Sequence, residues 1–260
     1  MPPGVQKGQV KRKYHPAGKP HPGRKGFVSS ILLALDSSTR TVGVALYDGI
    51  QVLNEAVWSS PDYHTVELAP AVAGALEKAG LNAEDLGAVA VAIGPGSFTG
   101  LRVGMALAKG LALVRRLPMV GIPTLDALAA AQPLQELPMA AVLRAGRGRL
   151  AVGWYQVIEN TARIEYAWQP QPGQAVTVLT PEELANKIQA PTLVCGELSE
   201  EERLLLAEQA PQARLASPAL SLRRPSFLAE LAWKRWKAGQ TDDPASLVPI
   251  YLHYNEPVPG

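Results

Sequence analysis

The chain has 260 residues, of which 47% are hydrophobic, enough for one large domain or two of ordinary size around a sizeable core. Its apolar runs are broken by Gly, Pro or Arg within about ten residues, well short of the roughly 20 that a membrane-spanning helix needs. We therefore predict no transmembrane segment. The single cysteine, Cys195, excludes an internal disulfide framework and favours a reducing, cytoplasmic setting. Its apolar neighbours predict a buried strand residue rather than a nucleophile.

The formal charge of +2 is distributed unevenly along the chain. Residues 1–25 hold seven Lys or Arg and no acid, which leaves 18 basic against 23 acidic groups in residues 26–260, a charge of about −5. Surfaces that bind nucleic acid carry clustered Lys and Arg, so this acidic body is not typical of them. Residues 1–28 are rich in Pro, Gly and Lys without apolar periodicity, which predicts a disordered basic arm. The arm either contacts RNA or is a dispensable extension, and its composition favours the extension.

Residues 29–131 are predicted to form a first lobe with the element order βββαβα. Apolar runs and turn residues separate its elements, and Gly80 is the expected end of its first helix. Pro70 lies inside that helix pattern and requires either a late helix start or a kink. The predicted elements are strands at 30–35, 42–47, 50–58, 88–93 and 119–122, and helices at 65–79, 98–116 and 124–131.

Residues 132–260 repeat this order, which predicts a second lobe and a duplicated α/β fold of two ribonuclease-H-like lobes. Three strands are expected within 137–170. Two helices then begin with capping boxes, one from Thr180 to Glu183 and one from Ser199 to Glu202. A buried strand between them, at 190–197, and a final helix at 226–237 complete the lobe.

The turn Gly94-Pro95-Gly96-Ser97 lies between a strand and a helix, where many proteins bind phosphate. The Walker pattern G-x-x-x-x-G-K-[ST] is absent, and the dinucleotide pattern G-x-G-x-x-G fails because the third glycine comes one residue late, at Gly100. What remains is a helix N-terminus, which attracts anions without specificity.

Gly100, Gly104 and Ala108 recur every four residues in the following helix and predict a shallow stripe on one face. Each glycine in a helix costs about 1 kcal/mol relative to alanine, so close packing is expected to compensate. The residue pattern leaves two alternatives open, which are packing within the fold and packing against a partner chain.

Asp36 ends the first strand and is followed by small hydroxyl residues, a pattern that can hold a magnesium-bound phosphate. The alternative is a turn-forming Asp that accepts hydrogen bonds from the next backbone N–H groups. His64 has Leu68 four residues later, where a helical metal site would place its second ligand. We therefore predict no metal site.

Four segments together resemble the TsaB, or YeaZ, family of bacterial tRNA threonylcarbamoyladenosine synthesis: ILLALDSSTRTVGVALYDG, GPGSFTGLRVGMALAKGLA, GIPTLDALA and LVPIYLHYNEPV. The resemblance implies an actin-like ASKHA fold and a cytoplasmic subunit with no activity of its own. The catalytic paralogue TsaD would be its heterodimer partner and would transfer the threonylcarbamoyl group to N6 of adenosine 37 in tRNAs reading codons that begin with A. An ATPase, TsaE, would join this complex, and tRNA would reach the chain only through it.

The resemblance further implies that the isolated chain holds no cofactor, with ATP and magnesium entering in the assembled complex. A homodimer of the chain alone is an alternative that the sequence leaves open. Many family members carry an acidic residue where this chain has Arg144, which argues against a nucleotide contact from the second lobe. An actin-fold ATPase or small-molecule kinase is the alternative function, and a peptidase is disfavoured by the single helical histidine.

In the family, the two helices after the first three strands pack against the equivalent pair of TsaD. Here those helices are expected at 65–79 and 98–115, and on this basis Gly104→Leu is expected to block assembly more than it lowers monomer stability. The implied partner interface consists of Leu68, Val72, Phe98, Gly100, Leu101, Arg102, Gly104, Met105 and Ala108.

Overall fold

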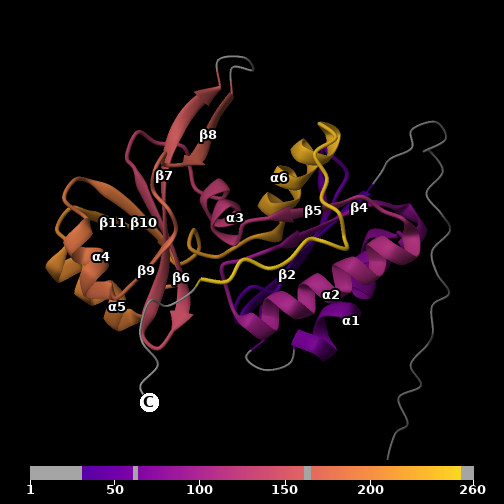
Figure 1. The fold of residues 1–260 in the computed structure, drawn as a ribbon, viewed down its shortest axis with the longest axis horizontal. Helices are drawn as coiled ribbons and strands as arrows, with labels where there is room; N and C mark the ends of the chain where they lie inside the picture. Colours follow the sequence, from indigo (N-terminus) through magenta and orange to yellow (C-terminus); the bar gives the residue numbers. More distant parts are fainter. Residues whose placement is uncertain (1–30, 61–63, 161–164, 253–260) are drawn as a thin grey trace, which may run out of the picture.

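The computed structural model describes residues 31–60, 64–160 and 165–252 and shows two lobes side by side, each built on one β-sheet (Figure 1). The basic arm predicted at residues 1–28 and the end of the closing family segment lie outside the described residues. Among the described helices, none is long and apolar enough to cross a membrane.

The first lobe contains a five-stranded sheet of order β3-β2-β1-β4-β5. The strands β1, β2 and β3 are antiparallel neighbours, while β4 and β5 run parallel to β1. Its elements are β1 (Ile31–Asp36), β2 (Thr41–Tyr47), β3 (Val52–Ser59), α1 (His64–Ala79), the short 3-10 helix η1 (Ala83–Asp85), β4 (Leu86–Ala92), α2 (Phe98–Arg115), β5 (Met119–Ile122) and α3 (Thr124–Ala130).

The second lobe contains a six-stranded sheet with the path β11-β10-β6-β7-β8, and β9 pairs with β7 beside it. Its elements are β6 (Met139–Gly146), β7 (Arg149–Asn160), β8 (Glu165–Pro170), β9 (Thr177–Leu179), α4 (Pro181–Lys187), β10 (Thr192–Gly196), α5 (Glu200–Gln209), β11 (Ala213–Leu215) and α6 (Pro225–Lys237).

The two sheets have the same topology. Each lobe begins with three antiparallel strands. A helix follows, and two later strands run parallel to the first strand of the same lobe. This confirms the predicted duplicated fold, in which each lobe continues the βββαβα order with one further strand and helix. The short strands β9 and β11 were not predicted, because three residues are too few to show a periodic pattern.

The first sheet is buried on both faces, because alternate residues of β1 belong to different cores. Leu33 and Leu35 pack with residues of α1 and α2, whereas Leu32 and Ala34 pack with α6. Although α6 comes last in the chain, it therefore covers the first sheet. Conversely, α3 supplies Leu125, Leu128 and Ala129 to the core of the second sheet, so α3 and α6 lie between the lobes and contact each other.

Helix α1 continues through Pro70, so the late start considered for it was wrong. Proline has no N–H, which leaves the carbonyl of Val66 without its helical partner. Both residues are exposed, so water can hydrate this carbonyl. The helix ends as expected at Gly80, whose φ of +67° suits glycine.

After α6, residues 242–252 return over the first lobe and are called here the C-terminal segment (yellow in Figure 1). The N–H of Asp242 donates to the carbonyl of Met119 (2.8 Å), and the N–H of Ile250 donates to the carbonyl of Ile93 (2.7 Å). The segment therefore runs from the edge strand β5 to the end of β4 and reaches the space between the lobes.

Candidate functional site

A cleft of about 1140 Å³ lies between the lobes. The first lobe lines it with the β1–β2 turn at 39–41 and with the turn at 95–98. The second lobe lines it with the end of β6 at 144–146 and with Glu197 and Leu198, and the C-terminal segment adds its last two residues. The strands that lead into the cleft end there, which is where α/β folds place ligand sites.

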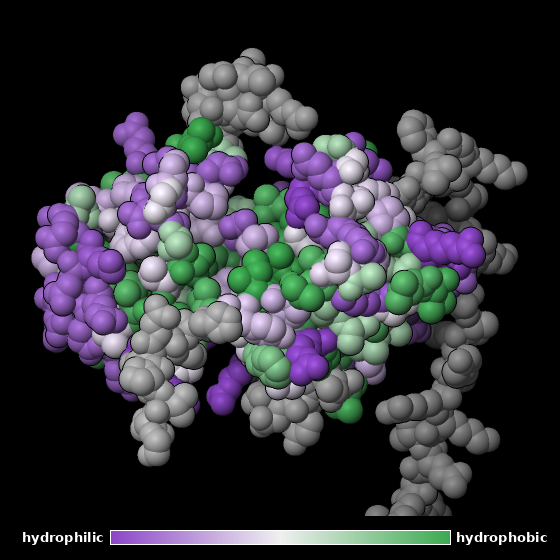
Figure 2. Space-filling model, in the orientation of Figure 1, coloured by the Kyte–Doolittle hydropathy of each residue, from purple (hydrophilic) through white to green (hydrophobic). Residues whose placement is uncertain are grey.

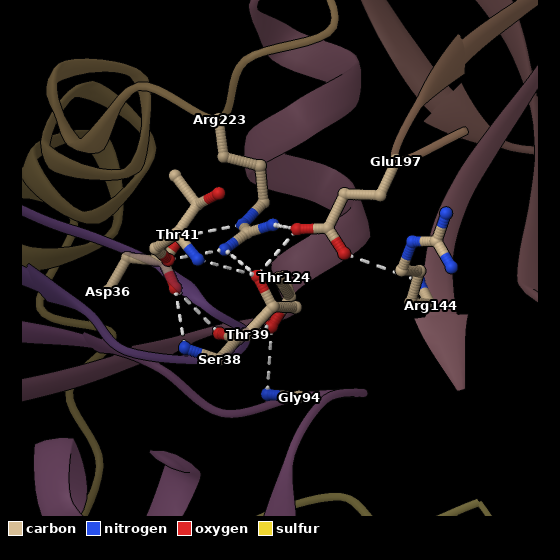
Figure 3. Close-up of polar contacts among 9 residues, drawn as sticks. All are labelled: Asp36, Ser38, Thr39, Thr41, Gly94, Thr124, Arg144, Glu197 and Arg223. Atoms are coloured by element: carbon tan, nitrogen blue, oxygen red, sulfur yellow. Dashed lines mark hydrogen bonds and ion pairs between the residues drawn. The ribbon is translucent and has the colours of Figure 1, made fainter. Parts of the chain in front are cut away.

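Asp36 ends β1, three residues before the cleft-lining turn at 39–41, and is 3% exposed. One carboxylate oxygen accepts hydrogen bonds from the backbone N–H (2.9 Å) and the hydroxyl (2.7 Å) of Ser38. The other oxygen accepts from Nε of Arg223 at 2.9 Å (Figure 3). Asp36 therefore has the turn-forming role considered as the alternative, and both of its oxygens have protein partners. Cofactor binding by Asp36 stays a prediction.

Arg223 comes from the loop between β11 and α6, and its side chain is only 2% exposed. Besides Asp36, its guanidinium donates to Glu197 and, through the second terminal nitrogen, to the Thr39 hydroxyl and the Thr41 carbonyl, both at 2.8 Å (Figure 3). Burial acts to lower the pKa of this guanidinium, but the carboxylates of Asp36 and Glu197 raise it above its usual value. The group is therefore a permanent cation.

The guanidinium of Arg223 affects whether a magnesium ion can bind beside Asp36 and Glu197. A magnesium ion requires oxygen ligands, usually one or two carboxylates with water and phosphate. The carboxylates of Asp36 and Glu197 already have Arg223 as their counter-ion, and the described residues contain no group of three or more His, Cys, Asp or Glu that could hold a metal. Bound magnesium would have to displace the guanidinium, so these residues do not fit a magnesium–nucleotide group without rearrangement.

The glycine-rich turn before α2 joins parts of the first lobe to one another. The N–H of Gly94 donates to the Thr124 hydroxyl (3.1 Å), and the N–H of Ser97 donates to the carbonyl of Ser38 (2.6 Å). A Cβ at Gly96 would lie 2.2 Å from that same carbonyl oxygen. Glycine is therefore required here because the β1–β2 turn approaches the start of α2 at backbone contact distance.

The small-residue stripe of α2 also faces inward. A Cβ at Gly100 would lie 2.2 Å from the carbonyl oxygen of Ser37, and one at Gly104 would lie 2.3 Å from the Ser37 hydroxyl. That hydroxyl donates to the carbonyl of Gly100 at 2.8 Å. Of the two alternatives for this stripe, the structure shows packing within the fold.

This packing bears on most of the implied partner interface. Seven of its nine residues are buried in the first lobe's own core and offer little surface to another chain: Leu68, Val72, Gly100, Leu101, Gly104, Met105 and Ala108. Periodicity groups residues on one face of a helix, but it does not say which face points inward when both faces are small or apolar. Phe98 and Arg102 are exposed, so for these two an interface role stays a prediction.

The solvent side of α1 and α2 also carries exposed apolar residues. Val66 on α1 and Leu113 on α2 are 64% and 66% exposed. Figure 2 shows apolar residues on this side of the first lobe, including a group over the right-hand end of α2. We define the α1–α2 face as the exposed residues Val66, Ala69, Pro70, Ala73, Phe98, Arg102, Ala106, Gly110, Leu113 and Val114.

Among the other candidate residues from the sequence, one is paired within its own lobe, one is buried, and the side chain of one lies outside the described residues. Arg144 contacts Glu202 within the second lobe through its terminal nitrogen (3.2 Å). Cys195 is fully buried, and burial raises the pKa of its thiol to about 12, which confirms the predicted buried strand residue. The side chain of His64 lies outside the described residues. Sequence reasoning did not find Arg223 or Glu197, because their partners are far away in the chain.

The profile of the family "TsaD: tRNA N6-adenosine threonylcarbamoyltransferase" matches residues 52–246. The tRNA threonylcarbamoyladenosine biosynthesis protein TsaB of Bacillus subtilis is 30% identical over 226 residues, which cover 86% of this chain and 95% of that protein. TsaB of Escherichia coli is 41% identical over 99 residues, covering 38% of this chain and 42% of that protein.

A solved structure supports the same relationship. YeaZ from Pseudomonas aeruginosa superposes with a TM-score of 0.69 at 28% identity, covering 86% of this chain and 100% of that chain. Similarity in sequence and in three-dimensional structure thus extends over most of the chain. The chain therefore belongs to the TsaB (YeaZ) family of tRNA threonylcarbamoyladenosine biosynthesis proteins.

Proposed function

We propose that this chain is a non-catalytic subunit of the complex that forms N6-threonylcarbamoyladenosine at position 37 of tRNAs reading codons that begin with A. In this proposal it works in the cytoplasm as the heterodimer partner of a catalytic TsaD-like paralogue. A TsaE-like ATPase joins the two, and tRNA contacts the chain only through the complex.

The observation that carries this proposal is the α1–α2 face. The residues that define it are apolar or small except for Arg102, although the same helices also expose Glu77, Lys78 and Arg115. Exposed apolar patches on a folded protein mark interaction sites. Residues 52–246 match the TsaD profile, so we expect a TsaD-like protein to contain a helix pair related to α1 and α2. Two related faces can pack around a local two-fold axis, as in most dimers.

The cleft supports a role without catalysis. An ATPase or kinase of this fold class needs acidic groups free to bind the metal of a metal–nucleotide complex. Here Asp36 and Glu197 both pair with the buried guanidinium of Arg223. The proposal therefore assigns the chemistry to the partner, and the isolated chain needs no cofactor.

The test is co-purification of the full chain with the TsaD-like protein of the same organism, in wild-type form and as Arg102→Glu. Arg102 lies on the α1–α2 face with its guanidinium 5.0 Å from the ring centre of Phe98. Arg40→Glu is the matched control, because Arg40 is an exposed arginine of the same lobe that lines the cleft instead. We expect wild type and Arg40→Glu to co-purify with the partner and Arg102→Glu to lose it.

A second measurement tests the pathway. Depletion of the chain in its own organism is expected to lower threonylcarbamoyladenosine in bulk tRNA, measured by mass spectrometry of nucleosides. Normal levels of this nucleoside would refute the proposal. Magnesium-dependent ATP turnover by the isolated chain that falls in Asp36→Ala would support the ATPase or kinase alternative instead.

A further inference from the structure

A buried ion pair joins the two lobes across the cleft. Glu197 directly follows β10 of the second lobe, and Asp36 ends β1 of the first lobe. Both carboxylates bind the guanidinium of Arg223. Figure 3 shows Arg223 between them, with Glu197 reaching across from the second lobe.

Glu197 is the residue of this cluster that crosses between lobes. Its Oε1 accepts from Arg223 and from the Thr39 hydroxyl, both at 2.5 Å. Its Oε2 accepts from the backbone N–H of Arg144 at 3.3 Å, which ties the side chain to its own lobe. In the described part of the chain, the other partners of Arg223 are Asp36, Thr39 and Thr41 of the first lobe. Opening of the cleft would therefore break the bonds from Glu197 to Arg223 and to Thr39.

Such opening would be unfavourable because the cluster is shielded from water. The side chains of Arg223, Asp36 and Glu197 are 2%, 4% and 17% exposed. Charge-assisted hydrogen bonds are strong in such surroundings, and separating a buried pair leaves charge without its partner. On the other side of the cleft, α3 and α6 already pack between the sheets. The lobes are thus held on two sides.

We propose that the Glu197–Arg223 ion pair locks the angle between the two lobes, so that the cleft does not open and close around a ligand. Arg223 is a cation supplied by the chain itself, and it bridges the lobes without a bound ligand. The chain is then a rigid body that presents the α1–α2 face in one fixed relation to the second lobe. This inference does not depend on the identity of the partner.

The variant that tests the lock is Glu197→Ala. Removal of the Glu197 carboxylate leaves Arg223 paired with Asp36 alone, so no buried charge is left without a partner. The matched control is Glu55→Ala, because the Glu55 side chain is 15% exposed and contacts Arg224 at 2.6 Å. Glu55 also accepts from the N–H of Ser226 at the start of α6. These partners pack on the same sheet, so the control pair does not cross the cleft.

The measurement is the distance distribution between two spin labels, one on each lobe, by pulsed electron paramagnetic resonance. Lys78→Cys on α1 and Glu208→Cys on α5 provide exposed attachment sites. The native Cys195 should not react with the label, because it is fully buried and its thiol pKa is about 12. We expect one narrow distribution for wild type and for Glu55→Ala, unchanged by magnesium and ATP, and a distribution at least twice as wide for Glu197→Ala.

A wild-type distribution that is broad, or that shifts with magnesium and ATP, would overturn the proposal. So would a Glu197→Ala distribution as narrow as that of wild type. Thermal unfolding of each labelled variant shows whether it is folded, and Glu197→Gln takes the place of the alanine variant if that one is not. The glutamine keeps the shape and removes the charge, so we expect its distribution to be wider than that of wild type.

Discussion

The helix pairs α1–α2 and α4–α5 occupy equivalent places in the two repeats, yet their surfaces differ. Helices α1 and α2 have 16 and 18 residues, whereas α4 and α5 have 7 and 10. The first pair exposes valines, leucine and alanines together with a few charged residues such as Lys78 and Arg102, while the second pair exposes mainly acidic and polar residues. Topology alone therefore says little about which lobe binds a partner. The surface composition is the reason that the proposed assembly uses the first lobe.

The two pairs are also stabilised differently. Both α4 and α5 begin with complete capping boxes, which satisfy N–H groups that a short helix cannot pair internally. Helix α2 has only the single cap of Ser97, but its glycine stripe packs against the β1–β2 turn. Tertiary packing holds the first pair, and local capping contributes more to the second.

The largest effect is expected for Gly104→Leu, which should lower the free energy of unfolding by about 3 kcal/mol. A Cβ there would lie 2.3 Å from the Ser37 hydroxyl, and that hydroxyl cannot turn away without losing its bond to the carbonyl of Gly100. Urea unfolding of the isolated chain measures the loss. The structure thus reverses our sequence-based expectation that this variant blocks assembly more than it lowers stability.

Gly110→Leu is the control for this prediction. It lies on the exposed side of the same helix, and a Cβ there meets no atom within 4 Å. Removal of a helical glycine should raise stability by about 0.5 kcal/mol. Equal destabilisation by both variants would show that the stripe at Gly104 has no special packing role.

The next largest effect separates the surfaces of the two lobes. Leu113 on α2 and Leu204 on α5 are similarly exposed, at 66% and 57%. Leu113→Glu should weaken binding to the TsaD-like partner by at least tenfold, about 1.4 kcal/mol, because it places a charge on an apolar contact surface. Leu204→Glu should leave the affinity unchanged. Titration calorimetry with the purified partner measures both, and equal losses would remove the distinction between the lobes.

A smaller effect tests the difference in capping. Ser199→Ala removes the hydroxyl that accepts from the N–H of Glu202 at 3.2 Å, and we expect it to lower stability by about 1 kcal/mol. Ser97→Ala removes the longer bond from Gly100, at 3.3 Å, in a helix held by packing, so its loss should be smaller. Urea unfolding of both variants gives the ranking, and the reverse order would contradict it.

The features that the sequence predicted well are local ones. Both capping boxes, the succession of the main strands and helices along the chain and the turn at Gly80 depend on residues a few positions apart. The pairing of Asp36 with Arg223 joins residues 187 positions apart, and no periodic pattern carries that information. The stripe on α2 was recognised, but its direction was not, because the solvent side of this helix carries apolar residues as well.

The smallest effect concerns a link where the lobes meet. The hydroxyl of Tyr155 on β7 donates to the carboxylate of Asp126 on α3 at 2.7 Å. Burial raises the pKa of Asp126, and the hydrogen bond from Tyr155 acts to lower it. A carboxyl whose pKa is raised on folding binds protons more readily in the folded state, so its contribution to stability falls as the pH rises.

Asp126→Asn should therefore flatten the dependence of stability on pH. At neutral pH it should change the free energy of unfolding by less than Ser199→Ala does. The amide oxygen can still accept from Tyr155. Tyr155→Phe should have the opposite effect on the slope, because it removes the bond that lowers the pKa of Asp126, and stability should then fall more steeply as the pH rises from about 4 towards 7. Urea unfolding across that range measures both slopes. If the two variants change the slope in the same direction, proton binding by Asp126 is not the cause of the pH dependence. The contact between Tyr155 and Asp126 would then join the lobes as a hydrogen bond whose strength does not depend on pH in this range.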